Sequence, residues 1–290
     1  MTGKKLLFVI NPASGSHNTN WKQVIGEYFA DKNYSIELFE LPEDCNIKMV
    51  QERISALEPD IVIAVGGDGT VKLVAECLLQ KNILLGILPG GSANGLAKEL
   101  GISEKPVQAL DTLVKNNVKK IHLVKINGQL CIHLSDVGFN AFVVKEFEST
   151  KGRGMWGYLK ASVKVLFKNP AMKAKLQLDD RETDIEAAMI VIANATKYGS
   201  GALINPEGRL DDDLFEVVTI KQISGREIFK MVVTHSDPDK EKTEIFQTRN
   251  LKITLDKPRH FQVDGEYCGK IVHIEAQLLP AAISIVVPLH

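Results

Sequence analysis

A short glycine-rich turn between an apolar run and a helical pattern constrains the fold of this chain more than any other feature. The apolar run, residues 61–65, is typical of a strand buried in a parallel sheet. The turn reads Gly66-Gly67-Asp68-Gly69-Thr70. After it, apolar residues recur on one face of a predicted helix: Val71, Val74, Ala75, Leu78 and Leu79. The order strand, turn, helix directs backbone N–H groups at one place, which favours binding of an anion such as phosphate.

The aspartate in this turn makes the interpretation more specific. A carboxylate at about 4 Å from a phosphate charge is repelled by roughly 4 kcal/mol at an effective dielectric near 20. A turn that binds phosphate through a divalent cation gains from Asp68 instead, because Mg²⁺ binds carboxylate and phosphate oxygens together. The alternative is a tight turn in which Asp68 or Thr70 only caps the following helix.

Length and composition narrow the class of protein. A chain of 290 residues with 44% hydrophobic and 24% charged residues is ordinary for a soluble globular protein, and it is long enough for two domains. The net charge of −1 argues against a nucleic-acid-binding protein. The four cysteines are far apart, so we expect them to be reduced: Cys45, Cys77, Cys131 and Cys268. We find no signal-peptide features and no apolar run long enough to span a bilayer, and we expect a cytoplasmic protein whose membrane contact, if any, is peripheral.

The first part of the chain alternates strands and helices. The expected strands are 6–10, 35–41, 61–65 and 84–88, and the expected helices include 21–31 and 47–57. Such repeated units imply a parallel sheet with helices on both faces. Ligands bind outside the carboxyl ends of the strands in these sheets. Turns rich in Gly, Ser, Asn or Asp follow three of the strands, at 11–15, 66–70 and 89–95, so we expect them to form one site.

After about residue 121 the pattern changes to separate strand-like segments, which predicts a mainly antiparallel second domain. The segments are 131–134, 173–178, 186–193, 215–220, 250–255 and 270–276. A last strand, 282–287, is expected to return to the first domain. A helix at 154–168 has lysines on one face, and it either packs on a sheet or rests on an anionic membrane surface.

Two other nucleotide-binding motifs are disfavoured, and two acidic segments have two interpretations each. The chain has no Walker-type loop, and a Gly-x-Gly-x-x-Gly at 152–157 has no convincing strand before it. Asp264 and Glu266 flank a glycine, which suits a β-turn. In a kinase, Glu266 is instead a candidate base for an attacking hydroxyl. The three aspartates at 211–213 form either a solvated turn or a cation site.

Taken together, these segments resemble the diacylglycerol kinase catalytic-domain family, which includes bacterial lipid kinases and the sphingosine and ceramide kinases. The matching segments follow the family's order over almost the whole chain: 11–15, 66–70, 89–94, 136–141, 198–201, 210–214 and 263–266. NAD kinases share the turn at 66–70, whereas the segments at 11–15 and 264–266 favour lipid kinases.

The resemblance implies a doubly wound α/β nucleotide-binding domain at 1–122 with 279–290, and an antiparallel β-sandwich lipid-substrate domain at 123–278. It implies ATP as co-substrate, Mg²⁺, and a diacylglycerol-like or sphingoid-like lipid acceptor at a membrane surface. The residues that it assigns to the nucleotide phosphates are Asn11, Pro12, Ala13, Ser14, Gly15, Gly66, Gly67, Asp68, Gly69, Thr70, Ser92 and Asn94. It also implies that Asp68 serves a catalytic Mg²⁺ and that Glu266 is the general base. A structural Mg²⁺ would use the Asp212 side chain and the carbonyls of Arg209 and Leu214.

The chain departs from the family's pattern at four positions. Gly95 and His122 stand where many members have aspartate, Lys72 replaces a common asparagine, and Asp213 replaces a glycine. The first hypothesis is a lipid kinase, and the alternatives are an NAD kinase or a nucleotide- or lipid-binding protein without catalysis. The lipid acceptor and the oligomeric state, with a homodimer as one alternative, stay open.

Overall fold

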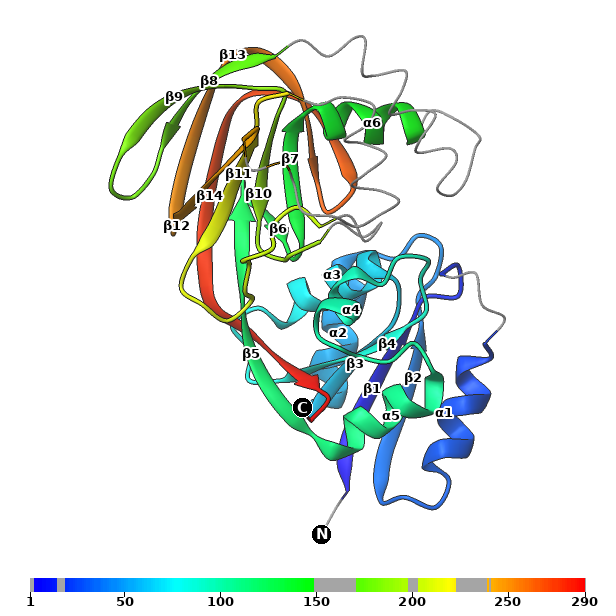
Figure 1. Cartoon of the computed structure of the whole chain (residues 1–290). Helices are drawn as coiled ribbons and strands as arrows, with labels where there is room; N and C mark the ends of the chain where they lie inside the picture. The colour runs from blue at the N-terminus through cyan, green and yellow to red at the C-terminus, as the bar shows by residue number, and fades with distance from the viewer. Residues whose placement is uncertain are drawn as a thin grey trace. The chain divides into compact units, whose positions relative to one another are not determined.

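The computed structural model describes residues 3–14, 19–148, 171–197, 203–222, 239 and 241–289. Two compact units make up the chain, Met1–Ile121 with Ala281–His290, and His122–Pro280 (Figure 1). The predicted helix at 154–168, the glycine motif at 152–157 and the segment 198–201 lie outside the described residues, as does Gly15.

The first unit is built on a parallel sheet in the order β4-β3-β1-β2. Its strands are β1 (Lys4–Ile10), β2 (Tyr34–Glu40), β3 (Ile61–Gly66) and β4 (Leu84–Pro89). The end of β14 (Glu266–Val287) extends this sheet, because Ile285 pairs with Leu85 in parallel. Every residue of β3 is buried, so both faces of the sheet are covered.

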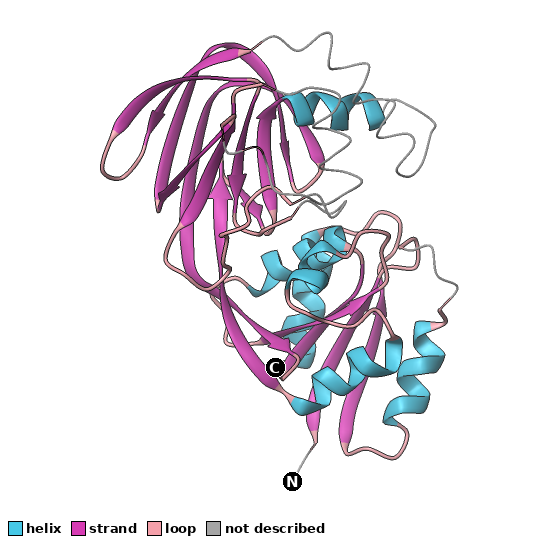
Figure 2. Cartoon of the chain, in the orientation of Figure 1, coloured by secondary structure: helices cyan, strands magenta, loops and turns pink. Residues whose placement is uncertain are grey.

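The described part of this unit has five helices: α1 (Trp21–Phe29), α2 (Ile47–Leu57), α3 (Asp68–Leu78), α4 (Gly95–Glu99) and α5 (Pro106–Lys115) (Figure 2). α1 contacts α5, and α2 contacts α3. The first two helices begin where asparagine side chains cap them, because Asn20 accepts from the Gln23 N–H and Asn46 from the Met49 N–H. The strands and helices predicted for this part are confirmed within two residues at their ends.

The second unit is antiparallel along most of its strands, in the order β12-β11-β10-β7-β13-β14. These strands are β12 (Thr243–Thr248), β11 (Phe215–Ile220), β10 (Met189–Ala193), β7 (Leu134–Gly138) and β13 (Asn250–Val263). Further elements described in this unit are β6 (Gln129–Cys131), β8 (Met172–Gln177), β9 (Glu182–Ala187) and α6 (Phe139–Glu148). The strand β5 (Asn117–Ile126) begins in the first unit and ends in the second.

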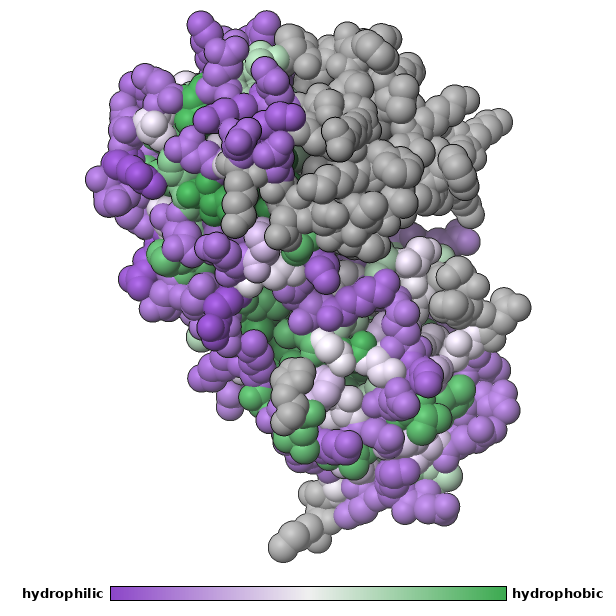
Figure 3. All heavy atoms as spheres, viewed as in Figure 1, coloured by the Kyte–Doolittle hydropathy of each residue, from purple (hydrophilic) through white to green (hydrophobic). Residues whose placement is uncertain are grey.

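The strand β13 joins two sets of strands, which form the two layers of this unit: β8 with β9, and β7 with β10, β11 and β12. It pairs with β8 through residues 252–255 and with β7 through residues 261–263, and its register against β14 shifts between these two stretches. Apolar side chains from both layers, such as Leu176 of β8 and Phe215 of β11, belong to one buried core. The predicted α/β plus β-sandwich fold class is therefore confirmed. Hydrophilic residues cover much of the visible outer surface of the described residues (Figure 3).

Some predicted boundaries were wrong. The segments 270–276 and 282–287 form one strand, β14, in which Pro280 lies between the stretch that pairs with β13 and the residue that pairs with β4. The segment 186–193 is two strands, which are separated at Ala188. The segment 131–134 is mainly the connection from β6 to β7. In the described ranges, no helix is long and apolar enough to cross a bilayer.

Candidate functional site

Polar turns follow β1, β3 and β4 at the carboxyl edge of the parallel sheet. The Asn11 side chain joins the first two turns, since its Nδ2 donates to Thr70 Oγ1 over 3.2 Å. Its Oδ1 accepts from the Ala13 N–H at 3.0 Å, and its backbone oxygen accepts from Ser14 Oγ at 2.7 Å. Pro12 and Ala13 are exposed at the tip of this turn. The structure thus brings the first two predicted segments together.

The turns after β3 and β4 touch through their glycine backbones. The Gly90 N–H donates to the Gly66 oxygen over 2.8 Å. A Cβ atom on Gly91 would lie 2.4 Å from the Gly67 Cα, a separation that real Cβ atoms essentially never show. Glycine is therefore required at position 91 for the two turns to meet.

Gly69 is different, because nothing lies within 4 Å of the place where its Cβ atom would be. It is exposed, and it stands in the first turn of α3. Neither packing nor a left-handed backbone conformation requires glycine there. This leaves room for a ligand to approach the backbone of α3 closely.

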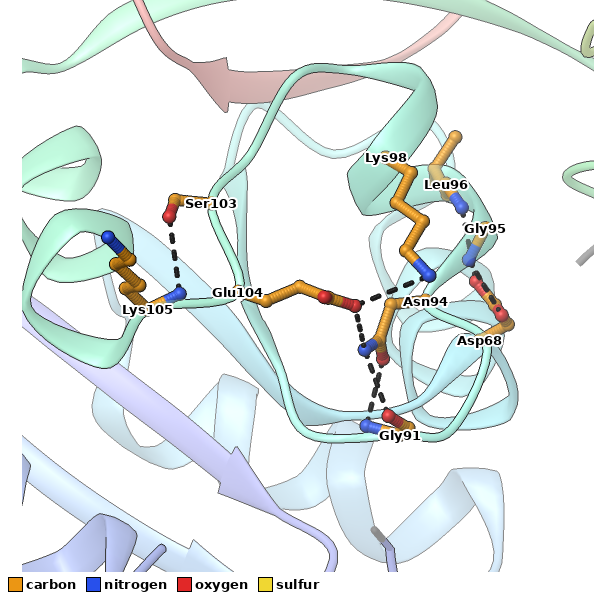
Figure 4. A network of polar contacts seen from close by, with 9 residues as sticks. All are labelled: Asp68, Gly91, Asn94, Gly95, Leu96, Lys98, Ser103, Glu104 and Lys105. Carbon is orange, nitrogen blue, oxygen red and sulfur yellow. Dashed lines mark hydrogen bonds and ion pairs between the residues drawn. The ribbon is translucent and has the colours of Figure 1, made fainter. Parts of the chain in front are cut away.

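The Asp68 carboxylate is held by backbone N–H groups of the next turn. Oδ2 accepts from the Gly95 N–H at 2.9 Å, and Oδ1 accepts from the Leu96 N–H at 3.1 Å (Figure 4). Asp68 therefore caps α4, whereas the start of α3, at Gly67, has no side-chain cap. Each oxygen of a carboxylate offers about two lone pairs, so one on each remains for a cation.

Asn94 holds the turn after β4 in shape. This residue is 4% exposed and has a left-handed backbone with φ of 52°. Its Oδ1 accepts from the Gly91 N–H at 2.8 Å, while its Nδ2 donates to the Gly91 oxygen at 2.9 Å and to Glu104 Oε1 at 3.0 Å. The side chain of Asn94 is thus engaged within the turn, and Ser92 lies exposed at the tip. The sequence motif does not include Glu104.

An aromatic side chain outside the predicted motifs borders the same turns. Trp21 begins α1, and its indole Nε1 would lie 3.3 Å from a Cβ atom on Gly90. Trp21 as a whole is half-buried.

The second predicted site lies on the hairpin between β13 and β14. Asp264 and Gly265 have φ of 51° and 86°, as a two-residue type I′ turn requires, and Val263 pairs with Glu266. The Asp264 carboxylate accepts from the N–H groups of Ile132 and His133 at 3.1 and 2.9 Å. Asp264 is therefore structural, whereas Glu266 is exposed.

A buried network of polar side chains is hydrogen-bonded to this hairpin. Asp136 Oδ2 accepts from Asn140 Nδ2 at 2.6 Å and from Gln262 Nε2. Gln262 Oε1 in turn accepts from the Gly265 N–H at 2.7 Å. The segment 136–141 thus helps to position the turn that carries Glu266, and it does so through Gln262. No sequence motif indicates this role of Gln262.

The three consecutive aspartates have different surroundings. Asp211 pairs with Arg209 at 3.3 Å, and Asp213 pairs with Arg249 at 3.0 Å. Asp212 is turned inward, and its buried Oδ1 has no hydrogen-bond partner among the described residues. Of the two alternatives for this run of aspartates, a wholly solvated turn does not describe Asp212.

A second carboxylate lies near Asp212. Glu216 of β11 is 1% exposed and accepts from Asn205 Nδ2 at 2.7 Å and from Gln247 Nε2 at 3.0 Å. Burial raises the pKa of Glu216, and the charge of Asp212 raises it further against the effect of these hydrogen bonds. Within the described ranges, no three His, Cys, Asp or Glu side chains form a metal cluster, so an ion at Asp212 would need carbonyl or water ligands. Among the described residues, Cys45, Cys77, Cys131 and Cys268 form no disulfide bond.

Comparisons with known proteins agree with this architecture. Residues 5–126 match the model of the diacylglycerol kinase catalytic domain, and residues 135–287 match that of the YegS C-terminal NAD kinase beta sandwich-like domain. A probable lipid kinase YegS-like protein of Yersinia pseudotuberculosis is 31% identical over 257 residues, which are 85% of each chain. An uncharacterized protein of Synechocystis is 29% identical over 83% of this chain, which spans 58% of that relative's length.

Solved structures show the same fold. A diacylglycerol kinase of Bacillus anthracis aligns with a TM-score of 0.72 over 99% of this chain and 98% of its own, at 20% identity. Both domain models match in the expected order, and the Yersinia relative matches over most of its length. The chain therefore belongs to the diacylglycerol kinase catalytic-domain family, in its YegS-like branch of two-domain proteins.

Proposed function

We propose that this protein is an ATP-dependent lipid kinase, which transfers the γ-phosphate to the hydroxyl of a diacylglycerol-like or sphingoid-like lipid. One observation carries the proposal: three polar turns meet at the carboxyl edge of the parallel sheet, with open space beside Gly69 and an oriented carboxylate at Asp68. The unit 1–121 with 281–290 would bind ATP, and the unit 122–280 would bind the lipid, with peripheral membrane contact.

The nucleotide phosphates would bind to the backbone N–H groups of the turns at 11–15, 66–70 and 89–95. Because Gly95 and Leu96 hold both oxygens of Asp68 from one side, the remaining lone pairs of the carboxylate suit a cation that also binds phosphate. When bound, Mg²⁺ would screen the charge of the phosphates. Asn94 would act through the shape of its turn.

Glu266 would serve as the general base. The lipid hydroxyl oxygen forms a bond to the γ-phosphorus while the bond from that phosphorus to the β,γ-bridging oxygen breaks, and ADP leaves. The hydroxyl proton goes to the Glu266 carboxylate, which is exposed on its hairpin. A placed base of this kind contributes roughly 10²–10⁴-fold to the rate.

A structural Mg²⁺ fits the loop before β11. The ligands would be the Asp212 side chain and the carbonyls of Arg209 and Leu214, and the buried Asp212 Oδ1 without a partner is the observation that supports this site. A cation there would also reduce the repulsion between Asp212 and Glu216.

A second candidate function is an NAD kinase. The observation that favours it is the match of residues 135–287 to a domain model named for its NAD kinase-like sandwich. The two functions differ only in the acceptor hydroxyl, so one assay distinguishes them.

The test is transfer of labelled γ-phosphate from ATP by the purified full chain to a panel of lipid alcohols in mixed micelles and, separately, to NAD. We expect a labelled lipid, and we expect Glu266→Gln to lose roughly 10²–10⁴-fold in turnover while it still binds ATP. Glu275→Gln is the matched control, because Glu275 is an exposed carboxylate of the same strand and pairs with Lys252. Labelled NAD alone would support the second candidate, and ATP binding without transfer would leave a binding protein.

A further inference from the structure

We propose that Glu104 is a positioning residue for the nucleotide-binding turn at 89–95, an inference that rests on the proposed function of this turn. Glu104 lies in the connection between α4 and α5. One of its oxygens, Oε1, accepts from Asn94 Nδ2 at 3.0 Å and pairs with Lys98 Nζ at 3.4 Å (Figure 4).

The contact selects one orientation of the Asn94 amide. A side-chain amide carries two N–H donors and one oxygen. The oxygen faces the Gly91 N–H, one donor faces the Gly91 carbonyl, and Glu104 accepts from the same nitrogen. A rotated amide would set its NH₂ group against the Gly91 N–H and its oxygen against the Glu104 carboxylate. Hydrogen bonds to a charged acceptor are stronger than neutral ones, so Glu104 favours the observed orientation.

Burial makes this contact consequential. Asn94 is 4% exposed, whereas the Glu104 side chain is 48% exposed. Removal of the carboxylate would take the charged acceptor from a buried N–H group without opening a cavity in the core. A buried donor that loses its acceptor is costly, and the turn can respond by a change of shape.

The conformation of this turn determines where the N–H groups that bind the Asp68 carboxylate lie. Asn94 directly precedes Gly95 and Leu96, whose N–H groups hold the two oxygens of Asp68. Gly91, the other partner of Asn94, lies against Gly67. Glu104 therefore acts through Asn94 on two of the contacts between the glycine turns, those of Asp68 and of Gly67.

The connection that carries Glu104 is itself ordered. Ser103 Oγ accepts from the Lys105 N–H at 3.2 Å and donates to Gln108 Oε1 at 2.7 Å (Figure 4 shows the first contact). These bonds fix the backbone on both sides of Glu104 to the start of α5. The carboxylate is thus presented to Asn94 from a defined loop.

Three variants of the full chain test the inference: Glu104→Ala, Glu104→Gln and Lys98→Met. We expect Glu104→Ala to raise KM for ATP about tenfold, which corresponds to ~1.4 kcal/mol, with kcat and the lipid KM within about twofold of wild type. Glu104→Gln should recover most of the ATP affinity, because its amide oxygen can still accept from Asn94 Nδ2. Lys98→Met is the matched control for loss of the ion pair alone, and it should behave as wild type.

A second measurement reports the stability of the turn at 89–95 in the absence of nucleotide. The Gly91 N–H donates a hydrogen bond to Asn94 Oδ1. Its hydrogen exchange should be faster in Glu104→Ala than in wild type and in Lys98→Met. Unchanged exchange and unchanged KM for ATP in Glu104→Ala would overturn the inference. A Lys98→Met protein whose KM for ATP rises as much as that of Glu104→Ala would also overturn it. Failure of the proposed function would appear instead as wild-type protein that binds no ATP, whatever the exchange shows.

Discussion

Two glycines of the candidate site allow its fold to be tested separately from its ligand. Gly91 is closed in by the Gly67 backbone, since a Cβ atom added at Gly91 would lie 2.4 Å from the Gly67 Cα, whereas Gly69 has nothing within 4 Å of its Cβ position. The same substitution, glycine to alanine, should therefore have opposite consequences at the two positions. The difference follows from where the added methyl group points.

The magnitudes follow from the contacts. Gly91→Ala forces a methyl group against backbone atoms, and overpacking of this kind costs about 1–3 kcal/mol of the free energy of unfolding. Gly69→Ala adds a methyl group to open space in the first turn of α3, and alanine is favoured over glycine in a helix by about 0.5–1 kcal/mol. If a phosphate binds against the α3 backbone, the methyl group occupies its place, and we expect ATP affinity to fall at least about tenfold.

The assay pairs urea unfolding with calorimetric titration of MgATP. Gly26→Ala is the control for Gly69→Ala, because Gly26 is an exposed glycine of α1 that also has nothing within 4 Å of its Cβ position. Both variants should keep or gain stability, but only Gly69→Ala should lose affinity. Wild-type ATP affinity in a stable Gly69→Ala protein would refute the assignment of this turn to the phosphates.

Three further predictions concern the surroundings of the two candidate sites. In a Trp156→Phe background, where Trp21 is the single tryptophan, MgATP should change the tryptophan fluorescence, and an unchanged spectrum at saturating MgATP would contradict a nucleotide beside Gly90. Mg²⁺ should raise the melting temperature of wild type in the absence of nucleotide and should do so less in Asp212→Asn, as thermal unfolding with and without EDTA will show. Burial raises the pKa of Glu216, so the folded protein binds this proton more tightly than the unfolded chain. The free energy of unfolding of the metal-free protein should therefore fall as pH rises from about 4.3 to the raised pKa, and urea unfolding at stepped pH should show a smaller fall in Glu216→Gln.

The sequence predicted the first unit well because its signals are local. Apolar runs end at polar turns, and the carboxyl ends of parallel strands share one edge, so the meeting of Asn11 with Thr70 followed from the order of elements. The partners of Asp68 did not follow, since they lie on α4, more than twenty-five positions further along the chain. The Glu104 contact was also missed, because nothing in its local sequence distinguishes it from an ordinary exposed glutamate.

The second unit was harder to predict for a physical reason. A strand that pairs with two layers, as β13 does, is continuous along the chain but changes its partners, so its length is not visible in a local pattern. The buried Glu216 had a signal, a single carboxylate in the apolar run of β11, and its inward neighbour Asp212 was marked as a candidate by the run of aspartates. Tertiary contacts alone distinguish Asp212 from Asp211 and Asp213.

The contacts of Asp68 affect how any substitution there must be interpreted. Its carboxylate links the turn after β3 to the start of α4, and its remaining lone pairs are those that a cation would use. Asp68→Ala removes both roles, and Asp68→Asn sets an NH₂ group against a backbone N–H. Loss of activity in either variant therefore fails to separate metal binding from the shape of the turns. Gly69 and Glu104 separate them, because one borders the open side of the site and the other acts on the turn from behind Asn94. If ATP affinity falls in both Gly69→Ala and Glu104→Ala while Gly69→Ala loses no stability, the turns bind the phosphates through their backbone, and the fold orients Asp68 through the N–H groups of Gly95 and Leu96.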